Sequence, residues 1–134
     1  MWNGDLKSGN GTISTDSGAL ANAQYSFGTR FENGTGTNPE ELIAAAHAGC
    51  FSMALSAQLA EAGLVAQSIH TTATVTLAKD GSGFAITGVH LDLTARIPGA
   101  DQQAFEKAAE NAKAGCPVSK LLKTTITLDK KLEA

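Results

Sequence analysis

The sequence predicts a fold of the α+β class, and three observations lead to this prediction. The opening segment is rich in glycine and contains short strand-like runs. The middle carries a long apolar helix with clear start and stop signals, and the second half changes between strand and helix periodicities. With 134 residues and 43% hydrophobic content, the chain is expected to form a single domain over residues 1–134 with a modest core of its own.

Residues 2–31 predict a small meander of strands. Glycine recurs through this segment, which is typical of a chain that turns often. The runs 11–15 and 23–27 have the composition of short strands, and residues 32–37 predict a loop.

A long helix is predicted to begin at Asn38, a favourable N-cap residue. Pro39 then takes the first helical position, and Glu41 stands where a capping box needs a carboxylate. The helix should run to about Ala62 and end at Gly63, which can adopt a left-handed cap. Because it is apolar nearly all round and contains many small residues, we expect a central helix that another backbone can approach closely.

The next segment predicts a strand hairpin. Residues 70–77 alternate as a strand, residues 79–83 form the turn, and residues 84–97 return as a second strand. The apolar positions of the second strand change phase at Gly88, which predicts a β-bulge there.

Two helices and a strand are expected after the hairpin. Asp101 caps a helix that stops at Gly115, residues 117–123 form a short second helix, and residues 124–132 alternate as a final strand. The apolar face of the first of these helices consists of Phe105, Ala108, Ala109 and Ala112.

Composition argues against two classes of partner. A formal net charge of −3 is unfavourable for nucleic-acid binding, which needs a basic surface. Residues 42–59 are apolar over a length that raises the question of a membrane helix, but His47, Gln58 and the capped start favour a buried helix instead. Since no targeting segment is visible, we expect a cytoplasmic protein.

The two cysteines, Cys50 and Cys116, are the candidate reactive groups. In a reducing compartment a permanent disulfide is disfavoured, so catalytic or redox use competes with the simpler role of a buried apolar filler. Cys116 precedes Pro117 at a helix junction, where it can act as an N-cap and where the positive end of the helix favours a thiolate. A zinc site is disfavoured by the absence of paired ligand spacings. His47 lies three residues before Cys50 and offers a nucleophilic dyad, although no third orienting residue is evident.

Four stretches taken together resemble the OsmC/Ohr family, that is, the osmotically inducible protein C and organic hydroperoxide resistance peroxidases. They are residues 29–31 (TRF), 36–42 (GTNPEEL), 45–55 (AAHAGCFSMAL) and 113–119 (KAGCPVS). The resemblance extends over essentially the whole chain, and the first and last stretches look closer to the OsmC branch. It implies antiparallel sheets around a long central helix in an intertwined homodimer.

The resemblance also implies a thiol peroxidase with four site residues. Cys50 would be the peroxidatic cysteine, and Arg30 would favour its thiolate and bind the peroxide oxygens. Glu40 would hold the guanidinium of Arg30, and Cys116 would condense with the Cys50 sulfenic acid to form a disulfide. The substrates would be organic hydroperoxides and hydrogen peroxide. The reductant would be an external dithiol or a lipoylated protein, with no metal or other cofactor.

Helix geometry adds an expectation about the dimer. Glu40 and Cys50 lie ten residues apart on one predicted helix, so about 15 Å and a turn of roughly 280° separate them. If Glu40 and Arg30 act on Cys50, we expect both to come from the partner chain, with each active site at the subunit interface.

Two other classes of function remain open from the sequence. A cysteine hydrolase or acyltransferase would use Cys50 with His47, and it would become acylated without consuming peroxide. A non-catalytic ligand-binding module would tolerate the loss of both thiols.

Overall fold

The computed structural model describes all residues, 1–134, and divides them into two compact units. The units comprise residues 1–42 and 43–134, so their boundary falls inside the long helix α2 (Pro39–Glu61). The expectation of a single domain over residues 1–134 stays a prediction.

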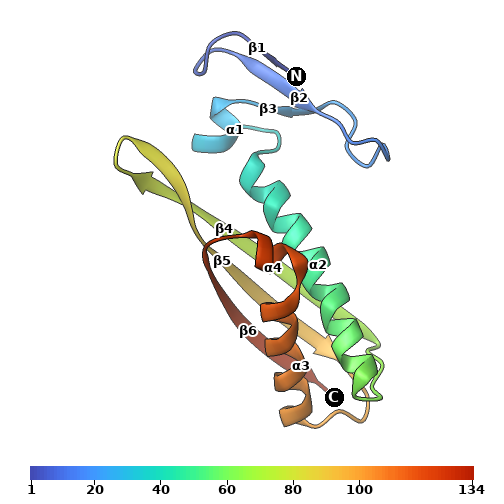
Figure 1. The fold of residues 1–134 in the computed structure, drawn as a ribbon. Helices are drawn as coiled ribbons and strands as arrows, with labels where there is room; N and C mark the ends of the chain where they lie inside the picture. The colour runs from blue at the N-terminus through green and yellow to red at the C-terminus, as the bar shows by residue number, and fades with distance from the viewer. The chain divides into compact units, whose positions relative to one another are not determined.

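The first unit contains a three-stranded antiparallel sheet and one short helix (Figure 1). The strands β1 (Trp2–Asn3), β2 (Asn10–Ile13) and β3 (Ala23–Tyr25) lie in that order in the sheet. The predicted meander is therefore present, with β1 as an additional strand. The helix α1 (Phe27–Phe31) was not predicted.

A local capping box explains why strand β3 is shorter than predicted. The backbone N–H of Ser26 donates to the Thr29 hydroxyl at 2.8 Å, and the N–H of Thr29 donates to the Ser26 hydroxyl at 3.3 Å. This reciprocal pair starts α1 immediately after β3, because it satisfies backbone N–H groups at the start of the helix that would otherwise lack partners.

Helix α2 has almost the predicted ends. The Asn38 side chain accepts a hydrogen bond from the N–H of Glu41 at 2.8 Å, and Gly63 has a φ of 73° just beyond the last turn. The capping box is incomplete, however. The Glu41 carboxylate accepts a hydrogen bond from the Thr37 hydroxyl at 2.7 Å instead.

The second unit contains a mixed three-stranded sheet. Strands β4 (Ser68–Asp80) and β5 (Gly83–Arg96) form the predicted antiparallel hairpin, and their register shifts between Thr76 and Leu77, opposite the predicted bulge at Gly88. Strand β6 (Thr125–Glu133) pairs with β5 in parallel. The expected antiparallel pairing is present in the other strand pairs, and the β5–β6 pair alone departs from it. Two intervening helices carry the chain back along the sheet before β6 begins, as a parallel connection requires.

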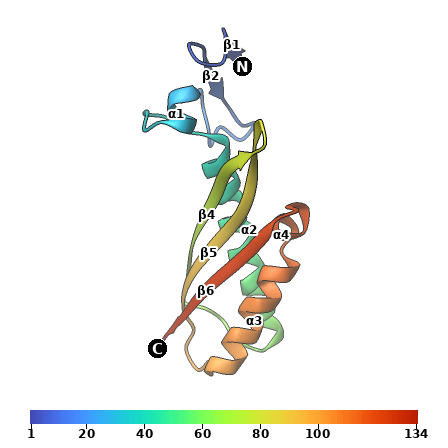
Figure 2. The same cartoon turned by 90° about the vertical axis from the view of Figure 1, so that its left-hand side faces the viewer.

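Helices α2 and α3 cover one face of this sheet, and no other element of the second unit covers the opposite face (Figure 2). Helix α3 (Gln102–Gly115) starts at Asp101, whose carboxylate accepts the N–H of Ala104 at 2.7 Å, and helix α4 (Pro117–Leu121) follows directly. The core lies between the sheet and these helices. Its fully buried large side chains include Phe51, Leu55, Leu59, Leu91, Ile97 and Phe105.

Only one face of α2 is buried within the chain. Its apolar stretch is long enough to span a bilayer by length and composition, and 28% of that stretch is buried. The buried face carries Phe51, Leu55 and Leu59 into the core. The opposite face is exposed and consists largely of small residues with one large apolar side chain, namely Ala45, Ala46, Gly49, Met53, Ser56 and Ala60.

Leu59→Ala tests the contribution of the buried face of α2. Leu59 is fully buried, so its truncation is expected to lower the free energy of unfolding by about 2–5 kcal/mol, through lost burial and the cavity left behind. Urea denaturation at fixed protein concentration measures this change. Val65→Ala is the control, because Val65 is 81% exposed and should change stability by less than about 0.5 kcal/mol. Equal effects of the two substitutions would contradict the assigned core.

Candidate active site

The fold brings the two cysteines of the chain into contact. Cys50 lies in the middle of α2 and is partly buried, whereas Cys116 lies between α3 and α4 and is fully buried. Both are free thiols, and their Sγ atoms are 3.0 Å apart. That separation permits a thiol hydrogen bond and leaves about 1 Å to close for a disulfide. These residues are 66 positions apart in the sequence.

Local sequence fixes the position of Cys116. The helix α3 packs its apolar face into the core and ends at Gly115, after which Pro117 starts α4 as its first residue. Cys116 caps both helices. Its N–H donates to the carbonyl of Ala112 at 3.0 Å, and Ala112 is itself part of the core. The thiol is therefore carried by a rigid junction rather than by a mobile loop.

The pKa values of the two thiols shift in opposite directions. Burial raises the pKa of the Cys50 thiol, and the hydrogen bond with Cys116 raises it further. Burial acts in the same direction on Cys116, but hydrogen bonds from Cys50 and Ser119 outweigh it, so the pKa of the Cys116 thiol is lowered. None of the groups that shift the pKa of Cys50 is a cation. Cys50 therefore needs a cation beside it to ionise readily.

His47 does not form the alternative dyad with Cys50. Its side chain is fully buried, and its Nε2 lies 2.7 Å from the hydroxyl oxygen of Ser119. Burial lowers the pKa of His47, so the imidazole is neutral near pH 7. Sequence reasoning missed Ser119 as the partner of His47. The sequence did offer one signal for it: Ser119 is a hydroxyl residue three positions after Cys116, in the helix that Cys116 caps.

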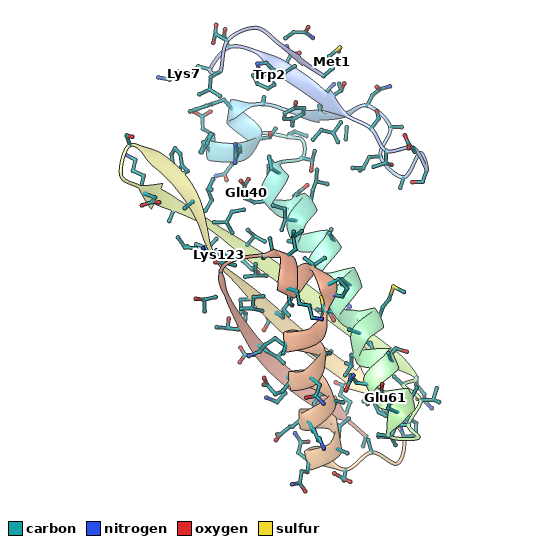
Figure 3. The ribbon with its side chains drawn as sticks, viewed as in Figure 1. Met1, Trp2, Lys7, Glu40, Glu61 and Lys123 are labelled. Carbon is teal, nitrogen blue, oxygen red and sulfur yellow. The ribbon has the colours of Figure 1, made fainter.

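Arg30 and Glu40 form an ion pair within the first unit. The guanidinium Nη2 lies 2.7 Å from Oε1 of Glu40, and Nε donates to the same carboxylate at 3.1 Å. Glu40 lies in the first turn of α2 (Figure 3). Arg30 belongs to the last turn of α1. This two-point contact fixes the plane of the guanidinium, and because Glu40 is only 8% exposed, few water molecules can compete for its carboxylate.

An apolar cavity of about 220 Å³ adjoins this ion pair in the first unit. Arg30 and Pro39 line it together with aromatic side chains, namely Trp2, Tyr25, Phe27 and Phe31. A cavity of this volume can hold an alkyl or aryl group next to a fixed positive charge.

One exposed group of side chains has a composition that could bind metal, and it lies on strands β5 and β6. The ligand atoms of His90, Asp92 and Asp129 lie within 4.8 Å of one another. Both ring nitrogens of His90 already have partners, because Nδ1 contacts the Thr127 hydroxyl at 2.6 Å and Nε2 contacts Asp129 at 3.1 Å. The cysteines contribute to no such group.

Comparison with known proteins identifies the family. The OsmC-like protein family matches residues 32–131. The chain is 56% identical over 133 residues to peroxiredoxin OsmC of Escherichia coli strain K12, covering 99% of this chain and 93% of that protein. It is 33% identical over 97 residues to organic hydroperoxide resistance protein-like 2 of Staphylococcus epidermidis, covering 71% and 66% of the two chains.

A solved structure agrees with these sequence relatives. The organic hydroperoxide resistance protein OhrB of Bacillus subtilis superposes with a TM-score of 0.70 at 26% identity, covering 99% of this chain and 95% of that one. The predicted family is thus confirmed, and the α+β fold with its long helix matches the family's structures. The chain belongs to the OsmC-like family and is a thiol-dependent peroxidase.

Proposed function

We propose that the protein reduces organic hydroperoxides and hydrogen peroxide through a Cys50 sulfenic acid and a Cys50–Cys116 disulfide. The observation that carries this proposal is the 3.0 Å separation between the two Sγ atoms. One thiol is partly exposed and can meet a peroxide, while the other is buried directly behind it. That order suits attack by Cys50 and resolution by Cys116.

The proposed cycle has three steps. The Cys50 thiolate attacks one oxygen of the peroxide, the O–O bond breaks, and an alcohol or water leaves as the sulfur becomes a sulfenic acid. The Cys116 sulfur then attacks the sulfur of that sulfenic acid and displaces hydroxide. The hydroxide leaves as water, and the two sulfurs form the disulfide. An external dithiol or a lipoylated protein reduces the disulfide by thiol–disulfide exchange. No step needs a metal or another cofactor.

Arg30 supplies the cation in this proposal. Its charge is permanent, and its donors can favour the Cys50 thiolate and bind the peroxide oxygens. Glu40 holds the guanidinium in one orientation at 2.7 Å and 3.1 Å, so the donors are placed before the substrate arrives. Both residues act by electrostatics and position, and neither changes its covalent bonds.

We further propose a homodimer in which Arg30 and Glu40 serve Cys50 of the partner chain. Helix α2 is continuous from Pro39 to Glu61, so the distance of about 15 Å between Glu40 and Cys50 along its axis applies within one chain. The first unit also buries no large apolar side chain of its own. A unit of this size needs to pack against another surface to be stable. The exposed face of α2 consists largely of small residues, so a second copy of the chain can approach it closely.

The remaining partner and location statements are part of the same proposal. The protein acts in the cytoplasm, where dithiol reductants are available, and it uses neither nucleic acid nor a membrane as a partner. The fully buried side chains of α2 support the assignment of this helix to a protein core.

Substitution of each cysteine tests the cycle. Intact mass after one equivalent of cumene hydroperoxide should fall by about two mass units, with loss of both thiols. Cys50→Ser should abolish peroxide reduction. Cys116→Ser should react once and then stall or over-oxidise. Acylation of Cys50 without peroxide consumption would indicate a hydrolase or acyltransferase instead. Absence of peroxide consumption, with a fold that tolerates removal of both thiols, would indicate a non-catalytic binding module. Unchanged steady-state turnover in Cys116→Ser, without an external thiol, would contradict the resolving role.

Substrate preference tests the apolar cavity beside Arg30. Burial of alkyl or aryl surface contributes roughly 25 cal/mol per Å², a gain that hydrogen peroxide cannot obtain. We therefore expect kcat/KM for cumene hydroperoxide to equal or exceed the value for hydrogen peroxide. A clear preference for hydrogen peroxide in the same assay would argue against an apolar substrate pocket.

Subunit mixing tests the sharing of residues between chains. Cys50→Ser and Glu40→Ala are each expected to be inactive alone. Heterodimers of the two should recover about one working site, because the first chain supplies Glu40 and the second supplies Cys50. Mass spectrometry of the intact dimers confirms that exchange has occurred. Proven heterodimers without activity would place the whole site within one chain.

A further inference from the structure

A line of polar side chains leads from the resolving thiol into the apolar core of the second unit. Ser119 lies three positions after Cys116 on α4, and a hydrogen bond from its hydroxyl contributes to lowering the pKa of the Cys116 thiol. The Ser119 hydroxyl oxygen lies 2.7 Å from Nε2 of His47. Cys116 and His47 are fully buried, and Ser119 is 8% exposed. A fully buried histidine is costly unless its polar atoms have partners, so this arrangement calls for an explanation.

The partners of His47 indicate the direction of its hydrogen bond. Within the chain its Nδ1 is buried and has no hydrogen-bond partner. A proton on Nδ1 would be an unpaired buried donor, which is rarer than an unpaired acceptor. We therefore assign the proton of the neutral ring to Nε2, from which it is donated to Ser119 Oγ. The Ser119 hydroxyl then directs its own proton to Cys116 Sγ.

We propose that His47 and Ser119 are positioning residues that favour the thiolate of Cys116 and so accelerate the disulfide-forming step. This inference rests on the proposed function, in which Cys116 resolves the Cys50 sulfenic acid. The oriented hydroxyl stabilises negative charge on Cys116 Sγ, and His47 prevents that hydroxyl from turning away.

The step that these residues assist is balanced as follows. The Cys116 thiol gives up its proton, and its thiolate attacks the sulfur of the Cys50 sulfenic acid. The new S–S bond forms as the S–O bond breaks, and the departing hydroxide takes up one proton, equal to the one lost by the thiol, and leaves as water. The Cys116 sulfur is oxidised and the Cys50 sulfur is reduced, so no further reactant is needed.

Few other titratable groups lie where they could favour the thiolate of Cys116. Cys50 of α2 faces it directly, and His47 faces it through Ser119. On α3, Lys113 pairs with Glu110 at 3.3 Å, and on α4 Lys120 is exposed to solvent.

Ser119→Ala tests the proposal in single-turnover experiments on the full chain. Rapid mixing with one equivalent of cumene hydroperoxide, followed by acid quench and intact mass, resolves sulfenic acid formation from disulfide formation. We expect disulfide formation to slow by roughly tenfold or more, as for the loss of a hydrogen bond to a charged group, and sulfenic acid formation to slow much less. Ser119→Thr, which keeps a hydroxyl, should restore the rate. Ser52→Ala is the control. Ser52 lies on the same helix as Cys50, and the substitution removes a comparable hydrogen bond, the one between Ser52 and Thr71 of β4.

The role of His47 is tested by coupling. If His47 acts only through Ser119, His47→Gln should slow disulfide formation in the natural chain but add nothing in the Ser119→Ala background. Equal slowing of both steps in Ser119→Ala, an unchanged rate of disulfide formation, or additive effects of the two substitutions would overturn the proposal.

A separate measurement distinguishes failure of this inference from failure of the proposed function. In Cys50→Ser the only thiol is Cys116, so thiolate absorbance near 240 nm against pH reports the pKa of Cys116 without any peroxide. We expect Ser119→Ala in this background to raise that pKa by about one unit. An unchanged pKa would refute the positioning role even in an active peroxidase. A raised pKa in a chain that consumes no peroxide would refute the peroxidase cycle alone.

Discussion

The packing of α2 against α3 and the sheet is the contact on which the arrangement of the thiols depends. Phe51 and Leu55 of α2 meet Phe105 and the alanine face of α3 in one buried cluster. Cys50 directly precedes Phe51, and Cys116 directly follows the end of α3. Because protein cores pack at near-crystalline density, this cluster fixes the separation of the two sulfurs to within a small margin. A looser core would leave the sulfenic acid without a nearby thiol.

The residues assigned to the proposed cycle are divided between the two units. The second unit holds both thiols, and burial there raises the pKa of Cys50, whereas the first unit holds Arg30, the cation that the proposed function places beside Cys50. Under the proposed dimer, a chain that has not met its partner would have a poorly ionised Cys50. Assembly would then couple folding to reactivity, because the same contact covers the first unit and supplies the cation.

The buried polar line from His47 to Cys116 illustrates a cost accepted for chemistry. An apolar residue of similar size in place of His47 would avoid the burial of an unpaired Nδ1. The histidine therefore lowers stability, and under the proposed function its benefit is the ordering of Ser119 beside the sulfur of Cys116. Local conflicts of this kind are expected at functional sites.

The sequence by itself determined the features that depend on near neighbours. Asn38, Gly63 and Asp101 marked helix ends because caps are made within three or four residues, and the apolar phase change at Gly88 located the bulge. The resemblance named Arg30, Glu40, Cys50 and Cys116 together, since these four stand in shared motifs. Only the tertiary structure decided the parallel pairing of β6, the 3.0 Å contact between the cysteines and the partnership of His47 with Ser119. Each joins residues far apart in the chain, and such contacts follow from the packing of whole faces rather than from any local pattern.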